Sequence, residues 1–185
     1  MRIVTRREYD EYAAAHPDQR VERTALGELV VMPLSDGRSG ARNFRILVDL
    51  GNWARADGRG RGFDSSTGFD LPNGANRAPD ASWVLHSRLA ELTEDDRDGY
   101  LPLCPDFVIE VRSKSDSLRG QMDKMTEYIG NGAQLGWLLD PLTRKAYVYR
   151  PGRGVEVYDN PTELRGGPEL PGFVLDLRRV WDPGF

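Results

Sequence analysis

The chain has 185 residues, of which 39% are hydrophobic and 29% charged, a composition typical of a globular protein. This length suits one domain with a proper core, so we expect residues 1–185 to form a single domain. The net charge of −4 argues against a protein that coats nucleic acid non-specifically, although it leaves room for a local basic groove.

The only cysteine, Cys104, excludes an intrachain disulfide and suits a reducing compartment. Its neighbours are apolar residues and proline, so we expect it to act as a small buried hydrophobic residue. The N-terminus has no apolar signal core, and no apolar run approaches membrane-spanning length. We therefore expect a cytoplasmic protein that makes no membrane contact.

The first thirty-odd residues predict a helix and a pair of strands. The sequence Thr5-Arg6-Arg7-Glu8 is a capping-box pattern, which favours a helix over residues 6–16 that stops at Pro17. Residues 21–33 are typical of two short strands joined by a turn, and Glu28 begins the second strand.

A second helix is predicted over residues 41–56, where apolar residues recur at helical spacing, and Gly58 suits its C-terminal cap. The composition of the glycine-containing segment 35–40 that precedes it predicts a loop. It lacks the P-loop pattern, so an ordinary connection is favoured over a phosphate site.

The middle of the chain predicts strands separated by a turn and a helix. Residues 62–71 favour a strand, 72–74 a hairpin turn, and 81–85 a short apolar strand that follows Pro79-Asp80. Residues 89–99 are acidic and favour a solvated helix.

The segment 107–111 organises the rest of the chain, because it is an apolar run typical of a strand covered on both faces. Asp106, Glu110 and Arg112 have the same parity and therefore share one face of this strand. An unpaired buried charge costs several kcal/mol. Two interpretations therefore stand side by side: an ion pair between Glu110 and Arg112, or a site that binds a cation.

After this strand, a helix is predicted over residues 116–130, with Lys124 at the flank of its apolar stripe beside Gln121 and Tyr128. Further strands are predicted at the positions 135–139, 146–149, 155–158 and 173–177. The order helix, hairpin, strand, helix and strand predicts a mixed sheet with helices packed on it.

If the strands at 81–85 and 107–111 pair, the carboxylates of Asp80 and Glu110 can converge across the sheet. Two carboxylates with open positions suit Mg²⁺, which retains several waters and binds substrate phosphate. Such a metal can polarise a phosphodiester and activate water, and a nearby ammonium group would stabilise the charge that develops on phosphorus.

Pro79-Asp80 followed at a distance by Glu110-Val111-Arg112 resembles the PD-(D/E)xK nuclease superfamily, which includes restriction endonucleases. More narrowly, the chain resembles the putative restriction endonuclease family, a domain-of-unknown-function family of that superfamily. The similar blocks are GELVVMP, FDSSTGFDLPNG, RAPDASWV, CPDFVIEVRSKSDSL, KMTEYIGNG, LGWLLDP and YRPG. The resemblance implies an α/β (α+β) fold: a restriction-endonuclease-like mixed sheet core flanked by helices, with an extra N-terminal helix and hairpin.

The resemblance also implies roles for individual residues. Asp80 and Glu110 would bind the metal, with the backbone carbonyl of Val111 as a third ligand. The superfamily usually has lysine where this chain has Arg112, which could neutralise charge but not act as a base. In this family the following helix supplies the lysine, and Lys124 is at the matching position.

Two other acidic residues are given lesser roles. Glu28 resembles a family acidic position and is expected to assist by holding a second metal or a water. Asp106 is expected to be a strand-start residue rather than a ligand.

Together these features predict an endonuclease that hydrolyses phosphodiester bonds of DNA with Mg²⁺ (or Mn²⁺). The alternative is a catalytically silent module of nuclease fold that binds nucleic acid or a protein partner. A local groove would contact the DNA, with Arg38, Arg42, Arg59 and Arg61 as candidates, and a homodimer would let two sites meet two strands.

Overall fold

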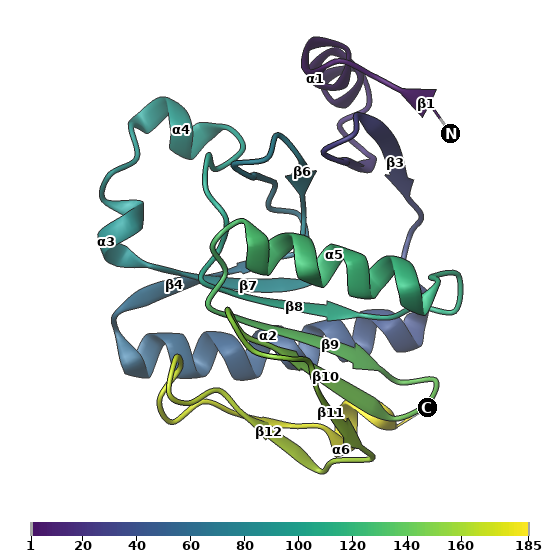
Figure 1. The fold of residues 1–185 in the computed structure, drawn as a ribbon, viewed down its shortest axis with the longest axis vertical. Helices are drawn as coiled ribbons and strands as arrows, with labels where there is room; N and C mark the ends of the chain where they lie inside the picture. The colour runs from purple at the N-terminus through teal and green to yellow at the C-terminus, as the bar shows by residue number, and fades with distance from the viewer. Residues whose placement is uncertain (1, 185) are drawn as a thin grey trace.

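A computed structural model describes residues 2–184. Its largest element is a six-stranded sheet with the strand order β11-β10-β9-β8-β7-β4 (Figure 1). Within this sheet β8 and β9 are parallel, and every other neighbouring pair is antiparallel. The strands are β4 (Gly60–Asp64), β7 (Ala81–Leu85), β8 (Phe107–Val111), β9 (Leu135–Asp140), β10 (Lys145–Tyr149) and β11 (Glu156–Asp159).

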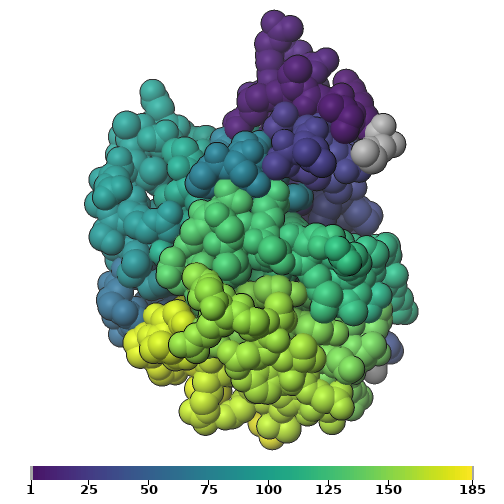
Figure 2. All heavy atoms as spheres, in the orientation of Figure 1, coloured from purple at the N-terminus to yellow at the C-terminus, as the bar shows by residue number. Residues whose placement is uncertain are grey.

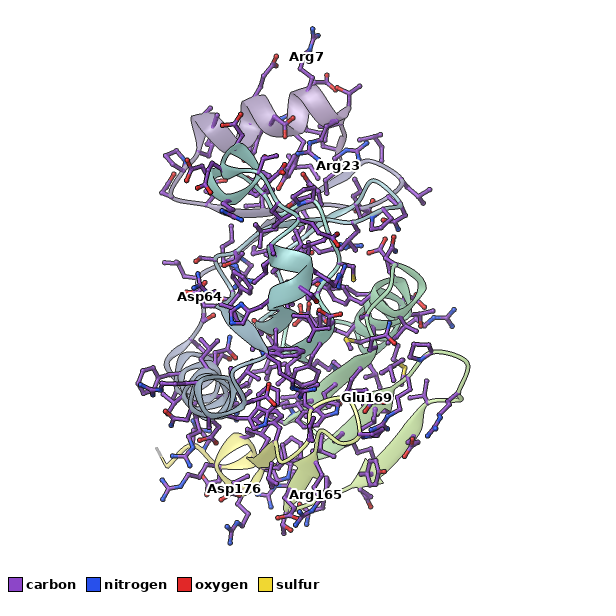
Figure 3. The ribbon with its side chains drawn as sticks, turned by 90° about the vertical axis from the view of Figure 1, so that its left-hand side faces the viewer. Arg7, Arg23, Asp64, Arg165, Glu169 and Asp176 are labelled. Atoms are coloured by element: carbon purple, nitrogen blue, oxygen red, sulfur yellow. The ribbon has the colours of Figure 1, made fainter. Side chains whose placement is uncertain are left out.

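Two long helices cover the two faces of this sheet, α2 (Gly37–Asp57) and α5 (Leu118–Gly130). Figure 3 shows them on opposite sides of the strands. Alternate residues of β8 belong to different cores: Phe107 packs in the cluster that contains α2 residues, and Val108 in the cluster that contains α5 residues. Because Glu110 has the parity of Val108, it lies on the α5 face.

The N-terminal part of the chain forms a second, five-stranded sheet with the order β1-β3-β2-β6-β5 and the helix α1 (Arg6–Ala15). Figure 2 shows the first residues as a projection at the top of the molecule. The capping box between Thr5 and Glu8 is present, which confirms the start of α1. The strands are β1 (Arg2–Ile3), β2 (Arg20–Arg23), β3 (Glu28–Met32), β5 (Phe69–Asp70) and β6 (Asn76–Arg77).

The remaining elements are short. Two short helices precede β8, and the C-terminal segment adds a strand pair and a helix that pack on the α2 side of the main sheet. These elements are α3 (His86–Leu89), α4 (Glu94–Asp98), β12 (Glu163–Arg165), β13 (Val174–Asp176) and α6 (Arg178–Trp181).

Three of the expected boundaries are wrong. The segment 35–40 is largely helical, because the Asp36 side chain accepts a hydrogen bond from the backbone N–H of Ser39 and starts α2 four residues early. The expected strand 62–71 is two strands, β4 and β5, which belong to different sheets. The expected helix 89–99 is interrupted, since Thr93 caps a new helix at α4.

The expected fold class is confirmed: mixed sheets flanked by helices, with an N-terminal helix and hairpin added. Within residues 2–184 no helix has the length and apolar character needed to cross a membrane.

Candidate active site

Asp80 and Glu110 meet at the end of two paired strands. Ala81 of β7 pairs with Ile109 of β8 in antiparallel register, so Asp80 and Glu110 follow as the next opposed positions. Asp80 Oδ2 accepts a hydrogen bond from the backbone N–H of Val111 at 2.8 Å. All three residues line one cavity of about 360 Å³. The expected convergence of the two carboxylates is therefore observed.

Lys124 reaches this pair from α5. Its Nζ lies 2.8 Å from Glu110 Oε1 and 2.8 Å from Glu22 Oε1. The side chain is buried against the sheet. The sequence predicts Lys124 at the flank of the apolar stripe, and in the structure this flank faces the sheet. The hydroxyl of Tyr128, one helical turn further along α5, donates to the same Glu110 oxygen at 2.9 Å.

Glu22 of β2 is the functional candidate that sequence reasoning missed. It is 2% exposed, and it accepts hydrogen bonds from Lys124, from Arg77 and from the backbone N–H of Ala78. Through Lys124 it connects the N-terminal sheet to the main sheet.

Glu28, which the sequence suggested for the assisting role, lies beside the turn of the same hairpin, two residues before Val30, the cross-strand partner of Glu22. It is the first residue of β3, pairs with Ile3 of β1 and does not line the cavity. The expectation that it assists in this site is not supported by its position. The signal for the correct residue was weak, because Glu22 stands in a short segment of alternating charge that is equally typical of an exposed strand.

Arg112 does not pair with Glu110. Its guanidinium binds Asp140 at 2.9 Å, at the C-terminal end of β9, and it lines a neighbouring cleft instead of the cavity that holds the carboxylates. The ion pair considered between Glu110 and Arg112 is therefore wrong, since Lys124 takes the place of Arg112. Asp106 lies at the opposite end of β8, bonded to Arg88, as expected of a strand-start residue.

Burial dominates the electrostatics of the two carboxylates. Burial raises the pKa of Glu110 to about 7; Lys124 opposes this change, while Asp80 and Glu22 add to it. Burial likewise raises the pKa of Asp80, against the hydrogen bond from Val111 and the charge of Lys124. A group whose charged form is disfavoured in this way favours the binding of a cation.

The two other charged groups of the site behave differently. Burial alone would lower the pKa of Lys124, but Glu110 and Glu22 outweigh it and raise the value, so the amine stays protonated. Burial alone would raise the pKa of Glu22, but Lys124 and Arg77 outweigh it and lower the value. Glu22 is therefore an anion whose charge is already balanced, unlike Asp80.

The residues at the cavity fit a hard divalent cation. Among residues 2–184 no lysine or arginine nitrogen lies within ion-pair distance of Asp80, and no donor lies within hydrogen-bond distance of Glu110 Oε2. The N–H of Val111 points toward Asp80, and in an extended strand its carbonyl points to the same side.

The described chain holds no cluster of three or more His, Cys, Asp or Glu side chains arranged for a metal. Asp80, Glu110 and the Val111 carbonyl would therefore leave positions for water, which Mg²⁺ retains more readily than other cations.

Two buried amide oxygens at this cavity also fit a hydrated cation. Asn43 Oδ1 and Gln121 Oε1 are buried, have no hydrogen-bond partner among residues 2–184, and belong to residues that line this cavity. A buried acceptor without a partner costs about 1–3 kcal/mol. Water molecules around a bound cation would supply the missing donors, so these atoms support the same interpretation as the carboxylates.

The comparisons with known proteins identify the family of the chain. Residues 6–178 match the model of the Uma2 family, described as "Putative restriction endonuclease". The chain belongs to the Uma2 family. The crystal structure of a putative nuclease belonging to DUF820 from Anabaena variabilis ATCC 29413 has a similar fold, with a TM-score of 0.76. The two chains are 21% identical, over 89% of this chain and 90% of that chain. No curated protein matches the chain.

Membership of the Uma2 family confirms the resemblance that the motifs indicated. The match spans every element that contributes to the cavity, from β2 to α5. The structural similarity establishes the fold of this Uma2 protein, while its chemistry depends on the residues of the cavity.

Proposed function

We propose that this protein is a metal-dependent endonuclease that hydrolyses phosphodiester bonds of DNA. The observation that carries the proposal is the pair Asp80–Glu110: a half-buried and a buried carboxylate at one cavity, of which Asp80 has no cationic partner in the described chain. Withdrawing a carboxylate from water without a cation is costly, and binding a divalent ion removes that cost.

Asp80, Glu110 and the carbonyl of Val111 would hold Mg²⁺ or Mn²⁺. The bound cation would polarise the phosphodiester and supply a water that is easier to deprotonate. Asn43 holds Asp80 in place, because its Nδ2 donates to Asp80 Oδ1 at 3.1 Å. Val111 fixes the other oxygen of Asp80 through its backbone N–H.

Lys124 is the group suited to stabilise negative charge on the scissile phosphate. The two carboxylates beside it keep the amine protonated, so it donates hydrogen bonds and does not accept a proton. Removing one preorganised donor of this kind typically costs about 100- to 1,000-fold in rate. Arg112 is paired with Asp140 and would contribute its positive charge to the neighbouring cleft, not to the cavity.

Glu22 and Tyr128 would position the groups that act. Glu22 holds the ammonium of Lys124 at 2.8 Å, as Glu110 does, and Arg77 in turn holds Glu22 at 3.1 Å. Tyr128 fixes one oxygen of Glu110 and leaves the other for a ligand. Supporting contacts of this kind typically change metal affinity or activity 10- to 100-fold when removed.

The proposal is tested by a plasmid-cleavage assay with Mg²⁺ or Mn²⁺, repeated with single-stranded DNA and RNA. Nicking or cleavage should require the metal and disappear in Asp80→Ala and Glu110→Ala. Glu28→Ala is the matched control, since it removes a carboxylate from the same hairpin as Glu22 but outside the cavity, and it should retain cleavage. Cleavage that survives Asp80→Ala would contradict the proposal, and so would the absence of any metal-dependent cleavage.

A further inference from the structure

A basic cleft adjoins the proposed active site. It has a volume of about 640 Å³ and lies between the start of α2, the loop that follows β8, the turn between β9 and β10, and the C-terminal helix α6. In Figure 1 the start of α5 and the tip of β8 lie on the right-hand side of the molecule. Five basic residues line the cleft: Arg38, Arg42, Arg112, Lys114 and Arg144.

Three of these side chains carry charge that the described residues do not neutralise. Arg38, Lys114 and Arg144 are exposed and make no ion pair within residues 2–184. Arg112 is paired with Asp140, and Arg42 donates to the backbone oxygen of Val180.

One carboxylate, Asp36, lines the same cleft, and it is engaged as the N-terminal cap of α2. In a chain with a net charge of −4, this local excess of cations is not explained by overall composition. It marks the cleft as a site for an anion.

The cleft and the carboxylate cavity are continuous. Four residues line both: Asp36, Ser39, Ser113 and Lys114. A ligand that passes from one to the other would present anionic groups to the cleft and a further anionic group to the metal site. Repeated negative charges at a regular spacing are the property of a nucleic-acid backbone.

We propose that this cleft binds the phosphate backbone of the DNA strand beside the scissile bond. The inference rests on the proposed nuclease function and names the part of the surface that holds its substrate. Three cations from separate segments suit a chain of phosphates better than a single small anion. Side chains that contact phosphates fix position without reading sequence, so the cleft would bind DNA of any sequence.

Of the four arginines that the sequence suggested for DNA contact, two line this cleft and two do not. Arg38 and Arg42 are in the first turns of α2, at the cleft. Arg59 and Arg61 follow the other end of this helix of 21 residues, about 30 Å away at 1.5 Å per residue. Arg59 is also paired with Asp57, whereas Arg61 is exposed. Arg61 is therefore a matched control for the cleft.

The test measures the binding of fluorescein-labelled duplex DNA by anisotropy, in EDTA and again with Ca²⁺, over a series of salt concentrations. The triple variant Arg38→Gln, Lys114→Gln, Arg144→Gln should weaken binding at least about tenfold. The slope of log affinity against log salt should become shallower by about 0.9 for each phosphate that the variant no longer neutralises. Arg61→Gln should bind as the wild type does. All four side chains are exposed, so folding should be unaffected, which circular dichroism checks.

The outcomes separate this inference from the nuclease proposal. Equal affinity of the triple variant and Arg61→Gln would overturn the inference, as would a wild-type protein that binds a glutamate-rich peptide but no DNA. Binding through the cleft without metal-dependent cleavage would uphold the inference and contradict the nuclease proposal alone. Cleavage with an unchanged KM in the triple variant would overturn the inference and leave the nuclease proposal standing.

Discussion

Of the three Pro-Asp pairs in the chain, Pro79-Asp80 and Pro105-Asp106 precede neighbouring strands of the main sheet, and the structure places these two in opposite surroundings. Asp106, after Pro105, has both oxygens engaged: the backbone N–H of Leu85 donates to one and the guanidinium of Arg88 to the other. Within the described residues Asp80, after Pro79, accepts hydrogen bonds only from uncharged donors, and it lines an open cavity with Glu110. Asp106 is therefore fully paired at the start of its strand, whereas Asp80 is a half-buried negative charge without a cationic partner in the described chain.

This difference teaches how to tell a structural acid from a candidate ligand. The two dipeptides have the same local sequence signal, and both precede buried strands of one sheet. They differ in whether the folded chain places a cationic side chain beside the carboxylate. A carboxylate withdrawn from water is stable when paired, and one that folding leaves unpaired is a candidate for cation binding.

The largest loss of stability is expected for Lys124, whose ammonium neutralises the buried carboxylates of Glu110 and Glu22. Lys124→Ala leaves Glu110 buried without its cation and Glu22 with Arg77 alone, and such a loss typically costs about 3–5 kcal/mol of unfolding free energy. Urea unfolding measures it. Lys114→Ala, an exposed lysine without an ion pair in the described chain, is the control and should change stability by less than about 0.5 kcal/mol. Equal losses in the two variants would contradict the account.

Asp80 and Asp106 should differ in their contribution to stability. Asp106→Asn removes the charge that holds Arg88 and should lower the free energy of unfolding by about 1–3 kcal/mol. Asp80→Asn should have little effect or stabilise the protein, because it removes an unpaired charge that burial disfavours. The new amide can still accept from Val111, and the amide of Asn43 can rotate to present its free oxygen.

Thermal or urea unfolding of both variants in a chelator tests this contrast. A stability loss at Asp80 that equals or exceeds the loss at Asp106 would show that Asp80 is a structural residue. In that case the cavity would lose its main support as a metal site.

A smaller effect is expected at Asn43, which orients Asp80 without carrying charge. Asn43→Ala should weaken Mn²⁺ binding about 10- to 100-fold, as is typical when a partner of a ligand is removed. Asn52→Ala is a suitable control, because Asn52 lies on the same helix and its side-chain oxygen accepts a hydrogen bond from Arg55, outside the cavity that Asp80 lines. Identical Mn²⁺ affinities for these two variants would remove Asn43 from the site.

The buried start of β8 also predicts that the thiol of Cys104 is unreactive. Cys104, beside the Pro105-Asp106 pair, is fully buried, and burial raises the pKa of its thiol to about 12. The thiolate fraction at pH 8 is then negligible, so iodoacetamide should alkylate the native protein at least about 100-fold more slowly than the urea-unfolded chain. Comparable rates in the two states would show that this end of the sheet opens.

Much of the sheet could be predicted from the sequence, because its strands carry strong local signals. The apolar run 107–111 and the helical stripe that follows it are observed as β8 and α5. Asp80, Glu110 and Lys124 were found because each matches a motif position. Strand pairing then places the two carboxylates at one cavity, and helix packing brings Lys124 to Glu110. The start of α2 was missed because glycines in the segment 35–40 concealed the cap at Asp36.

Glu22 could not be found by local reasoning. It lies 102 residues from Lys124 in the sequence, in a separate sheet, and only the packing of that sheet against α5 brings the two together. Arg112 shows the reverse error: its closeness to Glu110 in sequence suggested an ion pair, whereas the partner that folding provides is Asp140. Long-range packing decides which charges meet, and sequence distance does not report it.

The most direct test of the central claim is calorimetric titration of Mn²⁺ and Mg²⁺ into the wild type, Asp80→Asn and Asp106→Asn. The account predicts binding at one site in the wild type and in Asp106→Asn, and loss of that binding in Asp80→Asn. Equal binding by Asp80→Asn and the wild type, or no binding by any of the three, would contradict it.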